Sequence, residues 1–327
     1  LGEPDFRTPQ HICDAAVQAM QDGHTKYTPV AGIPDLRQAV CTKLKRDNNL
    51  AYLPENIVVS TGAKQSLANA VLCLINPGDE AIIPTPYWVT YAALVSLSEG
   101  KPIFVTCGIE TDFKICPEQL EAAITDKTRL FIFSSPCNPT GSVYSKEELA
   151  ALASVFERYP NITVISDEIY EYINYNGHHE SIAQFESIKD RVVVVNGFSK
   201  GFAMTGWRLG YIAATKELAQ ACEKLQAQFT SGTNSIAQRA AIAALLGDLT
   251  PSIDMVKAFQ ERKEYVIKNL ARINGIKINN PAGAFYAFPD VSSFFGKSDG
   301  TTIMTCAEDV AMYLLHKGHV TVVDGAA

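Results

Sequence analysis

VVVVNGFSKGFAMTGWRLGY, Val192 to Tyr211, is the stretch that best indicates the fold. Four consecutive valines are typical of a short strand that is buried on both faces, as in a parallel sheet covered by helices. A small, polar turn follows and ends at Lys200. Because ligands of open α/β sheets bind outside the carboxyl ends of the strands, we expect Lys200 at a ligand site.

Arg208 follows Lys200 by eight positions and precedes a second apolar stretch, Leu209 to Ala214. A lysine that can be desolvated and a fixed arginine would suit an aldehyde cofactor that carries a phosphate. The amine would form a Schiff base, and the guanidinium would bind the phosphate through two hydrogen bonds. A surface lysine and a surface arginine that flank a strand explain this stretch equally well, so the partners elsewhere in the chain must decide.

The composition indicates a globular enzyme. The 327 residues exceed one ordinary core, which favours a large domain plus a smaller one, and the hydrophobic content is 47%. The net charge is -7 and no basic run is present, so nucleic acid and anionic membranes are poor partners. No apolar run reaches transmembrane length, and the eight cysteines lack CxxC spacing. We therefore expect a cytoplasmic protein with reduced thiols and no metal site.

Short apolar runs alternate with helical patterns, which predicts crossover connections and a mostly parallel sheet. The expected strands lie near residues 57–60, 81–83, 102–106, 130–133, 162–166 and 192–195. The expected helices lie near residues 11–21, 36–44, 65–75, 117–124, 146–159, 216–229, 235–246 and 252–273. A small α+β unit would follow, with two strands around a Pro-Gly turn at 277–290, a helix at 306–317 and a strand at 320–323.

Several predicted strands end in residues that could bind a ligand. Asn138 lies in the loop SPCNPTG, where the Asn138-Pro139 bond could be cis or trans. Asp167 and Tyr170 follow the strand at 162–166. Trp88 follows the strand at 81–83, where core packing is the default and a flat ring over a cofactor is the alternative. These strand ends would meet at one edge of a parallel sheet.

Thr61-Gly62-Ala63-Lys64 connects the first predicted strand to a helix. The free N–H groups at such a helix N-terminus can hold a phosphate, although strand-to-helix turns that contain glycine are common. Together the strand-end groups match the needs of pyridoxal phosphate. This cofactor requires a lysine for its aldehyde, an anion for its ring nitrogen, donors for its ring oxygen, a flat cover and a phosphate cup.

Eight motifs in order carry a resemblance to a known family: GEPDF, KYTPVAGIPDLR, STGAKQ, PYWVTY, SPCNPTG, SDEIYE, NGFSKGFAMTGWRLGY and GAFY. The chain closely resembles class I aminotransferases, which are fold-type I pyridoxal phosphate enzymes, and in particular the bacterial aspartate aminotransferase subgroup. The resemblance covers nearly all 327 residues. It implies a large domain at 22–258, with a mostly parallel seven-stranded sheet flanked by helices. Residues 1–21 and 259–327 would form the small α+β domain.

The resemblance also implies the cofactor residues. Lys200 would carry the Schiff base and move the proton, with Asp167 at the ring nitrogen. Tyr170 and Asn138 would bind the ring oxygen. Trp88 would stack on the ring. The phosphate would be held by Gly62, Ala63, Ser199 and Arg208. Lys64 is a further expected neighbour of the cofactor.

The substrate and the partner subunit follow from the same resemblance. The implied substrate-binding residues are Gly2, Lys64, Trp88 and Asn138, and Lys64 would face the distal carboxylate of the substrate. Tyr27 would reach the phosphate of the other subunit, which makes a homodimer the working unit. The implied reaction moves an amino group from aspartate to 2-oxoglutarate by ping-pong kinetics, through an aldimine and a ketimine. Amino acids and 2-oxo acids would be its small-molecule partners.

Relatives in this subgroup extend beyond both ends of the sequence. They begin before the segment GEPDF, and they continue past the position of Asp324-Gly325 to an arginine for the α-carboxylate of the substrate. We therefore expect that this sequence is shortened and that the small domain is incomplete at both ends.

Two other functions fit the same residues. An aminotransferase of different specificity (prephenate, aromatic or alanine) or a carbon–sulfur lyase would share the cofactor residues and differ in the substrate pocket. A noncatalytic sensor domain, such as the effector domain of a transcription regulator, would normally carry a DNA-binding module. The sequence contains no basic helix-turn-helix segment.

Overall fold

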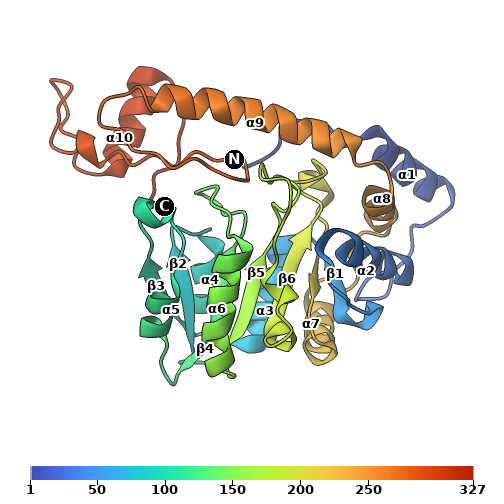
Figure 1. Cartoon of the computed structure of the whole chain (residues 1–327). Coiled ribbons are helices and arrows are strands. Elements are labelled where there is room, and N and C mark those ends of the chain that lie inside the picture. The colour runs from blue at the N-terminus through green and yellow to red at the C-terminus, as the bar shows by residue number, and fades with distance from the viewer. Residues whose placement is uncertain (1, 327) are drawn as a thin grey trace.

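A seven-stranded sheet forms the centre of the computed structural model, which describes residues 2–326 (Figure 1). Leu1 and Ala327, the outer ends of the predicted small domain, lie outside the described residues. The strand order is β1-β7-β6-β5-β4-β2-β3. The strands are β1 Ile57–Ser60, β2 Glu80–Thr85, β3 Lys101–Thr106, β4 Thr128–Ser134, β5 Thr163–Asp167, β6 Val192–Gly197 and β7 Gly210–Ala213.

β7 runs antiparallel to its neighbours β1 and β6, and the other pairs are parallel. The predicted mostly parallel seven-stranded sheet is therefore confirmed. β1, β2, β4, β5 and β6 all point the same way, so their carboxyl ends lie along one edge of the sheet.

The helices cover both faces of the sheet (Figure 1). They are α1 Gln10–Gln21, α2 Pro34–Asn48, α3 Ala63–Leu74, α4 Thr90–Leu97, α5 Pro117–Ala123, α6 Lys146–Arg158, α7 Lys216–Phe229, α8 Ser235–Leu246, α9 Thr250–Leu270 and α10 Ala307–Tyr313. Local sequence explains several helix starts, since Pro34 stands at the first turn of α2 and Ser145 with Glu148 forms a capping box on α6. The sequence patterns did not predict α4.

The four valines of β6 explain why a continuous apolar run suits this strand. Val192 and Val194 pack into the core beneath α2, α6 and α8, whereas Val193 and Val195 pack into the core beneath α3, α4 and α7. Alternate residues of a strand point to opposite faces, so a strand with two buried faces needs apolar residues at every position. Each buried valine contributes roughly 1.5–3 kcal/mol to stability.

Residues 271–326 differ from the sequence-based prediction. The two strands predicted at 277–290 are absent, and isolated bridges join Lys277 to Asp290 and Asn174 to Gly283. The backbone of 282–284 bonds instead to the loop after β5, where Ala284 N–H donates to the Ile173 carbonyl at 2.8 Å. The strand predicted at 320–323 is also wrong, because the described residues provide no neighbouring strand to pair with it. The predicted helix at 306–317 is α10, continued by a π-helical turn over Leu314–Gly318.

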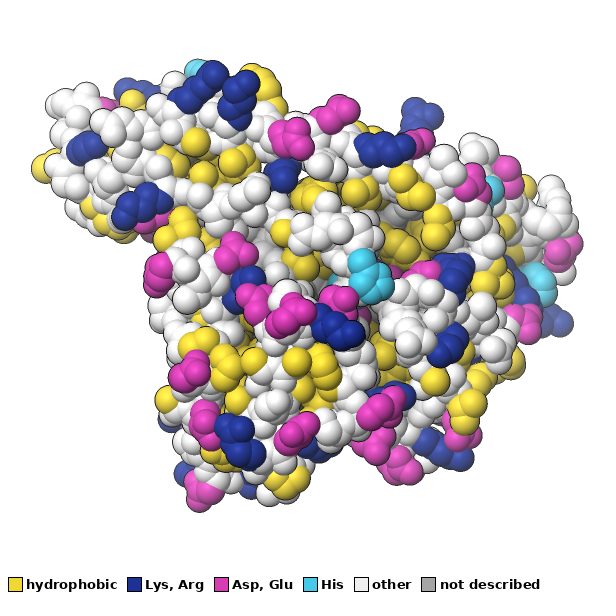
Figure 2. Space-filling view, in the orientation of Figure 1, with side chains coloured by type: hydrophobic (Ala, Val, Ile, Leu, Met, Phe, Trp, Pro, Cys, Tyr) yellow, Lys and Arg dark blue, Asp and Glu magenta, His cyan; other side chains and the backbone are white. Residues whose placement is uncertain are grey.

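α9 lies across the carboxyl edge of the sheet and leads to residues 271–326, at the upper left of Figure 1. Hydrophobic side chains gather along the junction between α9 and the sheet layer, and charges of both signs are interspersed over the face seen in Figure 2. Among residues 2–326, no helix is long and apolar enough to cross a membrane.

Candidate active site

A cavity of about 310 Å³ lies at the carboxyl ends of the parallel strands. The loops after β2, β4, β5 and β6, the first turn of α3 and the N-terminal segment all contribute to its wall. Its lining residues are Gly2, Ala63, Lys64, Trp88, Tyr91, Ser134, Asn138, Asp167, Ile169, Tyr170, Ser199, Lys200, Thr205, Arg208 and Tyr286.

Lys200 lies in the turn that follows β6, with its amine inside the cavity. Nζ donates a hydrogen bond to the backbone carbonyl of Gly2, and the rings of Tyr170 and Phe285 lie 5.8 and 5.7 Å from it. Burial lowers the pKa of the amine below its ordinary value of 10.5, while Glu3 opposes this shift. An amine with a lowered pKa is neutral more often near pH 7 and can act as a nucleophile or a base.

Asp167 ends β5 and is 3% exposed. Burial raises the pKa of its carboxyl to about 6, and the hydrogen bonds it accepts lower the pKa again. Oδ2 accepts a hydrogen bond of 2.8 Å from the Tyr91 hydroxyl, and Oδ1 accepts one of 3.3 Å from the Ile169 N–H. The carboxyl therefore has a fixed orientation and a charge that a nearby cation would stabilise.

Tyr170 lies in the loop after β5. It packs against Phe285 and Tyr286, in the segment 277–290 for which two strands were expected. Its hydroxyl lies 2.5 Å from that of Tyr286, and their rings meet edge to face. Burial raises the pKa of Tyr170 well above its ordinary value, and the adjacent Tyr286 adds to this effect. The phenol therefore remains protonated at neutral pH and can donate a hydrogen bond into the cavity.

Gly62 and Arg208 form the end of the cavity nearest to α3. Gly62, with φ +88°, caps α3, and a Cβ added there would lie 2.3 Å from Nη2 of Arg208. The guanidinium is therefore adjacent to the first turn of α3, where the Ala63 and Lys64 N–H groups precede the first hydrogen bond of the helix, which Gln65 N–H donates to the Gly62 carbonyl. Gly210 allows β7 to approach the same turn, since a Cβ on Gly210 would lie 2.3 Å from Ala63 N. This combination of cation and free donors is suited to an anion such as a phosphate.

Trp88 and Lys64 lie together at the cavity wall. The Trp88 ring is part-buried and meets Tyr91 edge to face at 5.8 Å between ring centroids. Lys64 Nζ lies 4.9 Å from the Trp88 ring, which is a cation–π contact. Asn138 lies in the loop after β4, where the Asn138-Pro139 peptide is cis.

The structure brings most of the predicted site residues together. Ten of them line the cavity, and Gly62 lies against Arg208 at its border. Tyr27 is not among the lining residues of its own chain, and its side chain is 99% exposed.

Sequence reasoning missed five further lining residues: Tyr91, Ser134, Ile169, Thr205 and Tyr286. Two signals for them were present, because Tyr91 ends the motif PYWVTY and Tyr286 ends GAFY. No sequence signal marked Ser134, whose buried hydroxyl has no hydrogen-bond partner in this structure.

Three potential metal ligands, Glu168, Glu171 and His179, approach one another behind the loop that carries Asp167. Protein cations already pair with both carboxylates, since Lys43 bonds to Glu171 and His179 lies 3.0 Å from Glu168. We therefore assign no metal to this cluster.

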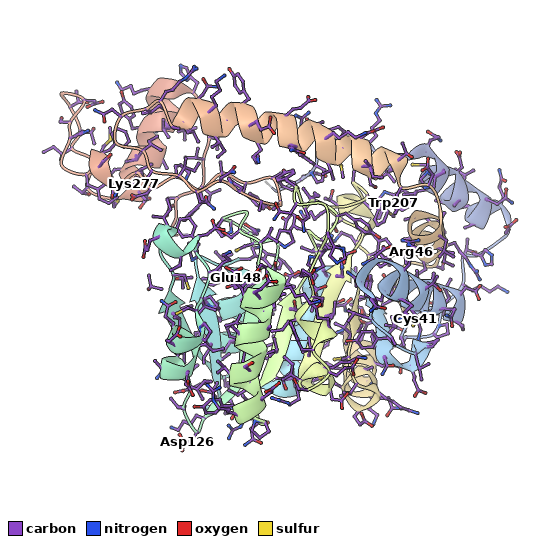
Figure 3. The ribbon with its side chains drawn as sticks, in the orientation of Figure 1. Cys41, Arg46, Asp126, Glu148, Trp207 and Lys277 are labelled. Atoms are coloured by element: carbon purple, nitrogen blue, oxygen red, sulfur yellow. The ribbon has the colours of Figure 1, made fainter. Side chains whose placement is uncertain are left out.

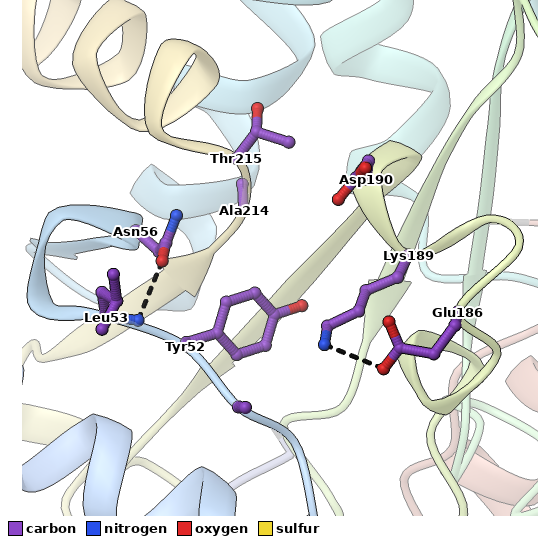
Figure 4. A pocket seen from close by; sticks show the side chains of 9 residues that line it. Tyr52, Leu53, Asn56, Glu186, Lys189, Asp190, Ala214 and Thr215 are labelled. Carbon is purple, nitrogen blue, oxygen red and sulfur yellow. Dashed lines mark hydrogen bonds and ion pairs between the residues drawn. The ribbon is translucent and has the colours of Figure 1, made fainter.

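A second hollow of about 320 Å³ lies at the opposite edge of the sheet, near the starts of β1 and β6 (Figure 4). Tyr52 points into it between Asn56 and the ion pair of Lys189 with Glu186. None of the predicted site residues lines this hollow.

Comparison with known proteins reveals close relatives. The family model for aminotransferase class I and II matches residues 1–327. The chain is 49% identical to a Petunia hybrida bifunctional aspartate aminotransferase and glutamate/aspartate-prephenate aminotransferase, over 100% of this chain and 69% of that protein. It is 48% identical to a Nitrosomonas europaea aspartate/prephenate aminotransferase, over 100% of this chain and 83% of the relative.

Solved structures agree with these sequence matches. An aspartate aminotransferase from Rhizobium meliloti has a TM-score of 0.97 and 42% identity, with 100% of this chain and 82% of that chain covered. A Thermus thermophilus aspartate aminotransferase with maleate has a TM-score of 0.92 and 38% identity, with the same coverage.

Proposed function

Because this chain belongs to the class I and II aminotransferases, we propose that it uses pyridoxal 5'-phosphate to move an amino group from aspartate to 2-oxoglutarate. The observation that carries the proposal is the grouping of Lys200, Asp167 and Arg208 around one cavity. An amine, a buried carboxylate and a guanidinium are what the aldehyde, the ring nitrogen and the phosphate of this cofactor require. Relatives named as aspartate aminotransferases support aspartate as the amino donor.

The residues present fit the cofactor. Gly62 lacks the Cβ that would collide with Arg208, so the guanidinium and the first turn of α3 can hold a phosphate together. In this proposal Ser199 and Ala63 complete the phosphate site. The orphaned hydroxyl of Ser134 gives the wall a further polar group.

When bound, pyridoxal phosphate supplies an aldehyde that reacts with amines and a ring that withdraws electrons from the α-carbon of the amino acid. Asp167 would hold a proton on the ring nitrogen, because its buried carboxylate is stabilised by a cation beside it. Tyr170 and Asn138 would donate hydrogen bonds to the ring oxygen. Trp88 would cover one face of the ring and exclude water.

Lys200 would bind the aldehyde and, once the substrate amine has replaced it, would move a proton at the substrate α-carbon. The lowered pKa of its amine suits both tasks, since each needs the neutral form. The hydrogen bond to the Gly2 carbonyl orients the amine within the cavity. A second 2-oxo acid would reverse these steps, which gives ping-pong kinetics.

We assign substrate binding to Gly2, Lys64, Trp88 and Asn138, which line the cavity. Lys64 supplies a cation for the distal carboxylate of aspartate, and charge-assisted hydrogen bonds of this kind are among the strongest in proteins. Prephenate is the second candidate substrate, because the Nitrosomonas europaea relative is named for both aspartate and prephenate.

The working unit in this proposal is a homodimer in the cytoplasm. Tyr27 supports the dimer, because an almost fully exposed aromatic side chain outside its own cavity is free to reach a partner's site. We also propose domains at 22–258 and at 1–21 with 259–327. Contacts between the N-terminal segment and α9 support this grouping: the Phe6 and Phe259 rings lie 5.3 Å apart, and Asp5 pairs with Arg262 at 2.7 Å.

The proposal is tested with purified protein loaded with pyridoxal phosphate. Aspartate, alanine and phenylalanine are each offered with 2-oxoglutarate, and prephenate is offered to aspartate as an alternative acceptor. We expect aspartate to give the highest kcat/KM and to change the cofactor absorbance in the absence of an acceptor. An absorbance change without any transfer to an acceptor would indicate a lyase, and no change with any amino acid would indicate a binding protein.

A further inference from the structure

A buried ion pair lies behind the loops that carry the candidate active site. Lys43 of α2 pairs with Glu171 in the loop after β5, and their side chains are 1% and 3% exposed. Lysine and glutamate are almost never fully buried unless they are paired. Replacement of such a pair by apolar residues is often neutral or stabilising, so stability alone does not account for it.

Hydrogen bonds connect this pair to the strand that leads to Lys200. Glu171 Oε2 accepts a hydrogen bond of 2.9 Å from Asn196 Nδ2, and Asn196 lies near the end of β6. Lys43 Nζ donates to Asn48 Oδ1 at 2.8 Å, so polar partners surround the ammonium as well. The Glu171 carboxylate therefore links α2 to Asn196 at the carboxyl end of β6, four residues before Lys200.

Tyr172 links the Lys43–Glu171 pair to the turn that carries Lys200. Its ring lies 5.3 Å from Lys43 Nζ, and its hydroxyl donates to Asp47 of α2 at 2.7 Å. A Cβ on Gly201 would lie 2.7 Å from the ring, so the backbone next to Lys200 rests directly on Tyr172. Asp47 also pairs with Arg46, which is labelled in Figure 3 near the C-terminal end of α2.

The loop that carries Glu171 and Tyr172 also carries Tyr170, and it begins directly after Asp167, the last residue of β5. One buried cluster thus holds two active-site segments against α2, and neither Lys43 nor Glu171 lines the cavity. We propose that the Lys43–Glu171 pair is a positioning device, which fixes the Lys200 amine relative to Asp167 and Tyr170. This inference rests on the proposed function, because it assigns the pair to the same reaction.

Replacement of the charges separates positioning from stability. Lys43→Met or Glu171→Leu alone leaves a buried charge without a partner, and we expect a melting temperature several degrees below that of the wild type. The double variant, Lys43→Met with Glu171→Leu, should recover part of the melting temperature, because it removes the unpaired charge but leaves Asn196 without the Glu171 carboxylate. It should still show a kcat for aspartate lowered about 10- to 100-fold, with a smaller change in KM, because misplacement by about 1 Å can cost on the order of 10²-fold.

The second readout needs no cofactor. The apparent pKa of the Lys200 amine is measured in the cofactor-free protein from the pH dependence of its reductive methylation, with the modified peptide identified by mass spectrometry. We expect the double variant to shift this pKa relative to the wild type. Glu171→Asp keeps the charge but shortens the reach to Asn196, and it should shift the pKa in a variant that folds.

Leu152→Ala serves as the matched control, because Leu152 of α6 is 1% exposed and lies away from the cavity. It should lower the melting temperature without changing the Lys200 pKa or kcat. Wild-type kcat and wild-type Lys200 pKa in either the double variant or Glu171→Asp would overturn the inference. Absence of transamination by the wild type would instead overturn the proposed function, and the Lys200 pKa would still test the positioning role.

Discussion

The Tyr91 hydroxyl donates a hydrogen bond of 2.8 Å to Oδ2 of Asp167, and both side chains are buried. This contact joins α4 to the end of β5 on the floor of the cavity. A hydrogen bond to the ionised form of a carboxyl favours that form, so Tyr91 opposes the effect of burial on Asp167.

Tyr91→Phe should therefore raise the pKa of Asp167 above its value of about 6. A hydrogen bond to a charged group is worth about 1.5–3 kcal/mol, which corresponds to a shift of roughly one to two pKa units. The carboxyl stretching band of Asp167, assigned from the difference between infrared spectra of cofactor-free protein with and without Asp167→Asn, measures this pKa. Tyr87→Phe is the control, because the Tyr87 ring stacks on Phe104 instead of bonding to Asp167. An unchanged band in Tyr91→Phe would contradict the prediction.

Asp167→Asn should stabilise the cofactor-free protein at pH 7 to 8 while activity is lost. The carboxyl ionises near pH 3.8 when unfolded and near pH 6 when folded, so the folded state binds the extra proton between these values. The free energy of unfolding then falls as the pH rises from about 4 to 6 and stays lower above pH 6. The gain from removing the charge is on the order of 3 kcal/mol.

Urea unfolding as a function of pH measures this gain, which should vanish below about pH 4. Asp254→Asn removes a carboxylate from an exposed pair with Lys257, and it should change stability by less than about 0.5 kcal/mol. Equal stability of wild type and Asp167→Asn at pH 8 would mean that burial does not penalise this charge.

Gly62→Ala should weaken cofactor binding through Arg208. The new Cβ would lie 2.3 Å from the guanidinium and would displace it from the first turn of α3. Loss of one charge-assisted interaction predicts a dissociation constant for pyridoxal phosphate raised about 10- to 150-fold, measured by equilibrium dialysis. Gly78→Ala is a matched control, since Gly78 has φ +86° and no atom within 4 Å of the added Cβ. Equal weakening in both variants would assign the effect to backbone strain instead.

Residues at strand ends could be predicted from local sequence, because buried apolar runs mark the strands and parallel strands end at one edge. Lys200, Asp167 and Asn138 belong to this group. Tyr286 could not be predicted in this way. The backbone of 282–284, just before Tyr286, bonds to the distant loop after β5. The sequence of 277–290 alone instead suggested two strands that pair with each other.

The burial of Tyr91 and Lys43 could not be predicted from the local sequence either. α4 carries apolar side chains around most of its circumference, so it lacks the periodicity by which a surface helix is recognised, and Tyr91 was missed with it. Lys43 occurs in a helix rich in charged residues, where a solvated side chain is the usual expectation, yet it is 1% exposed. Only the tertiary contact with Glu171 explains its position.

Lys64 should determine the preference for dicarboxylic substrates. Its ammonium lies at the start of α3, where a cation is not favoured by the helix dipole, and it is held over the Trp88 ring at 4.9 Å on the cavity wall. A local anion would compensate for this placement, and the distal carboxylate of aspartate is the anion that the proposed function supplies. Lys64→Met should lower kcat/KM for aspartate by about 10- to 150-fold, the equivalent of 1.5–3 kcal/mol for a charge-assisted contact.

Alanine is the informative comparison, because it has no distal carboxylate and its kcat/KM should change much less. Lys64→Arg keeps the cation and should retain most of the preference for aspartate, which separates loss of charge from loss of packing on Trp88. The affinity for pyridoxal phosphate should hardly change in either variant, since Arg208 and the first turn of α3 remain in place. An equal loss for aspartate and alanine, accompanied by weaker cofactor binding, would assign Lys64 to the phosphate and remove the structural argument for a dicarboxylic substrate.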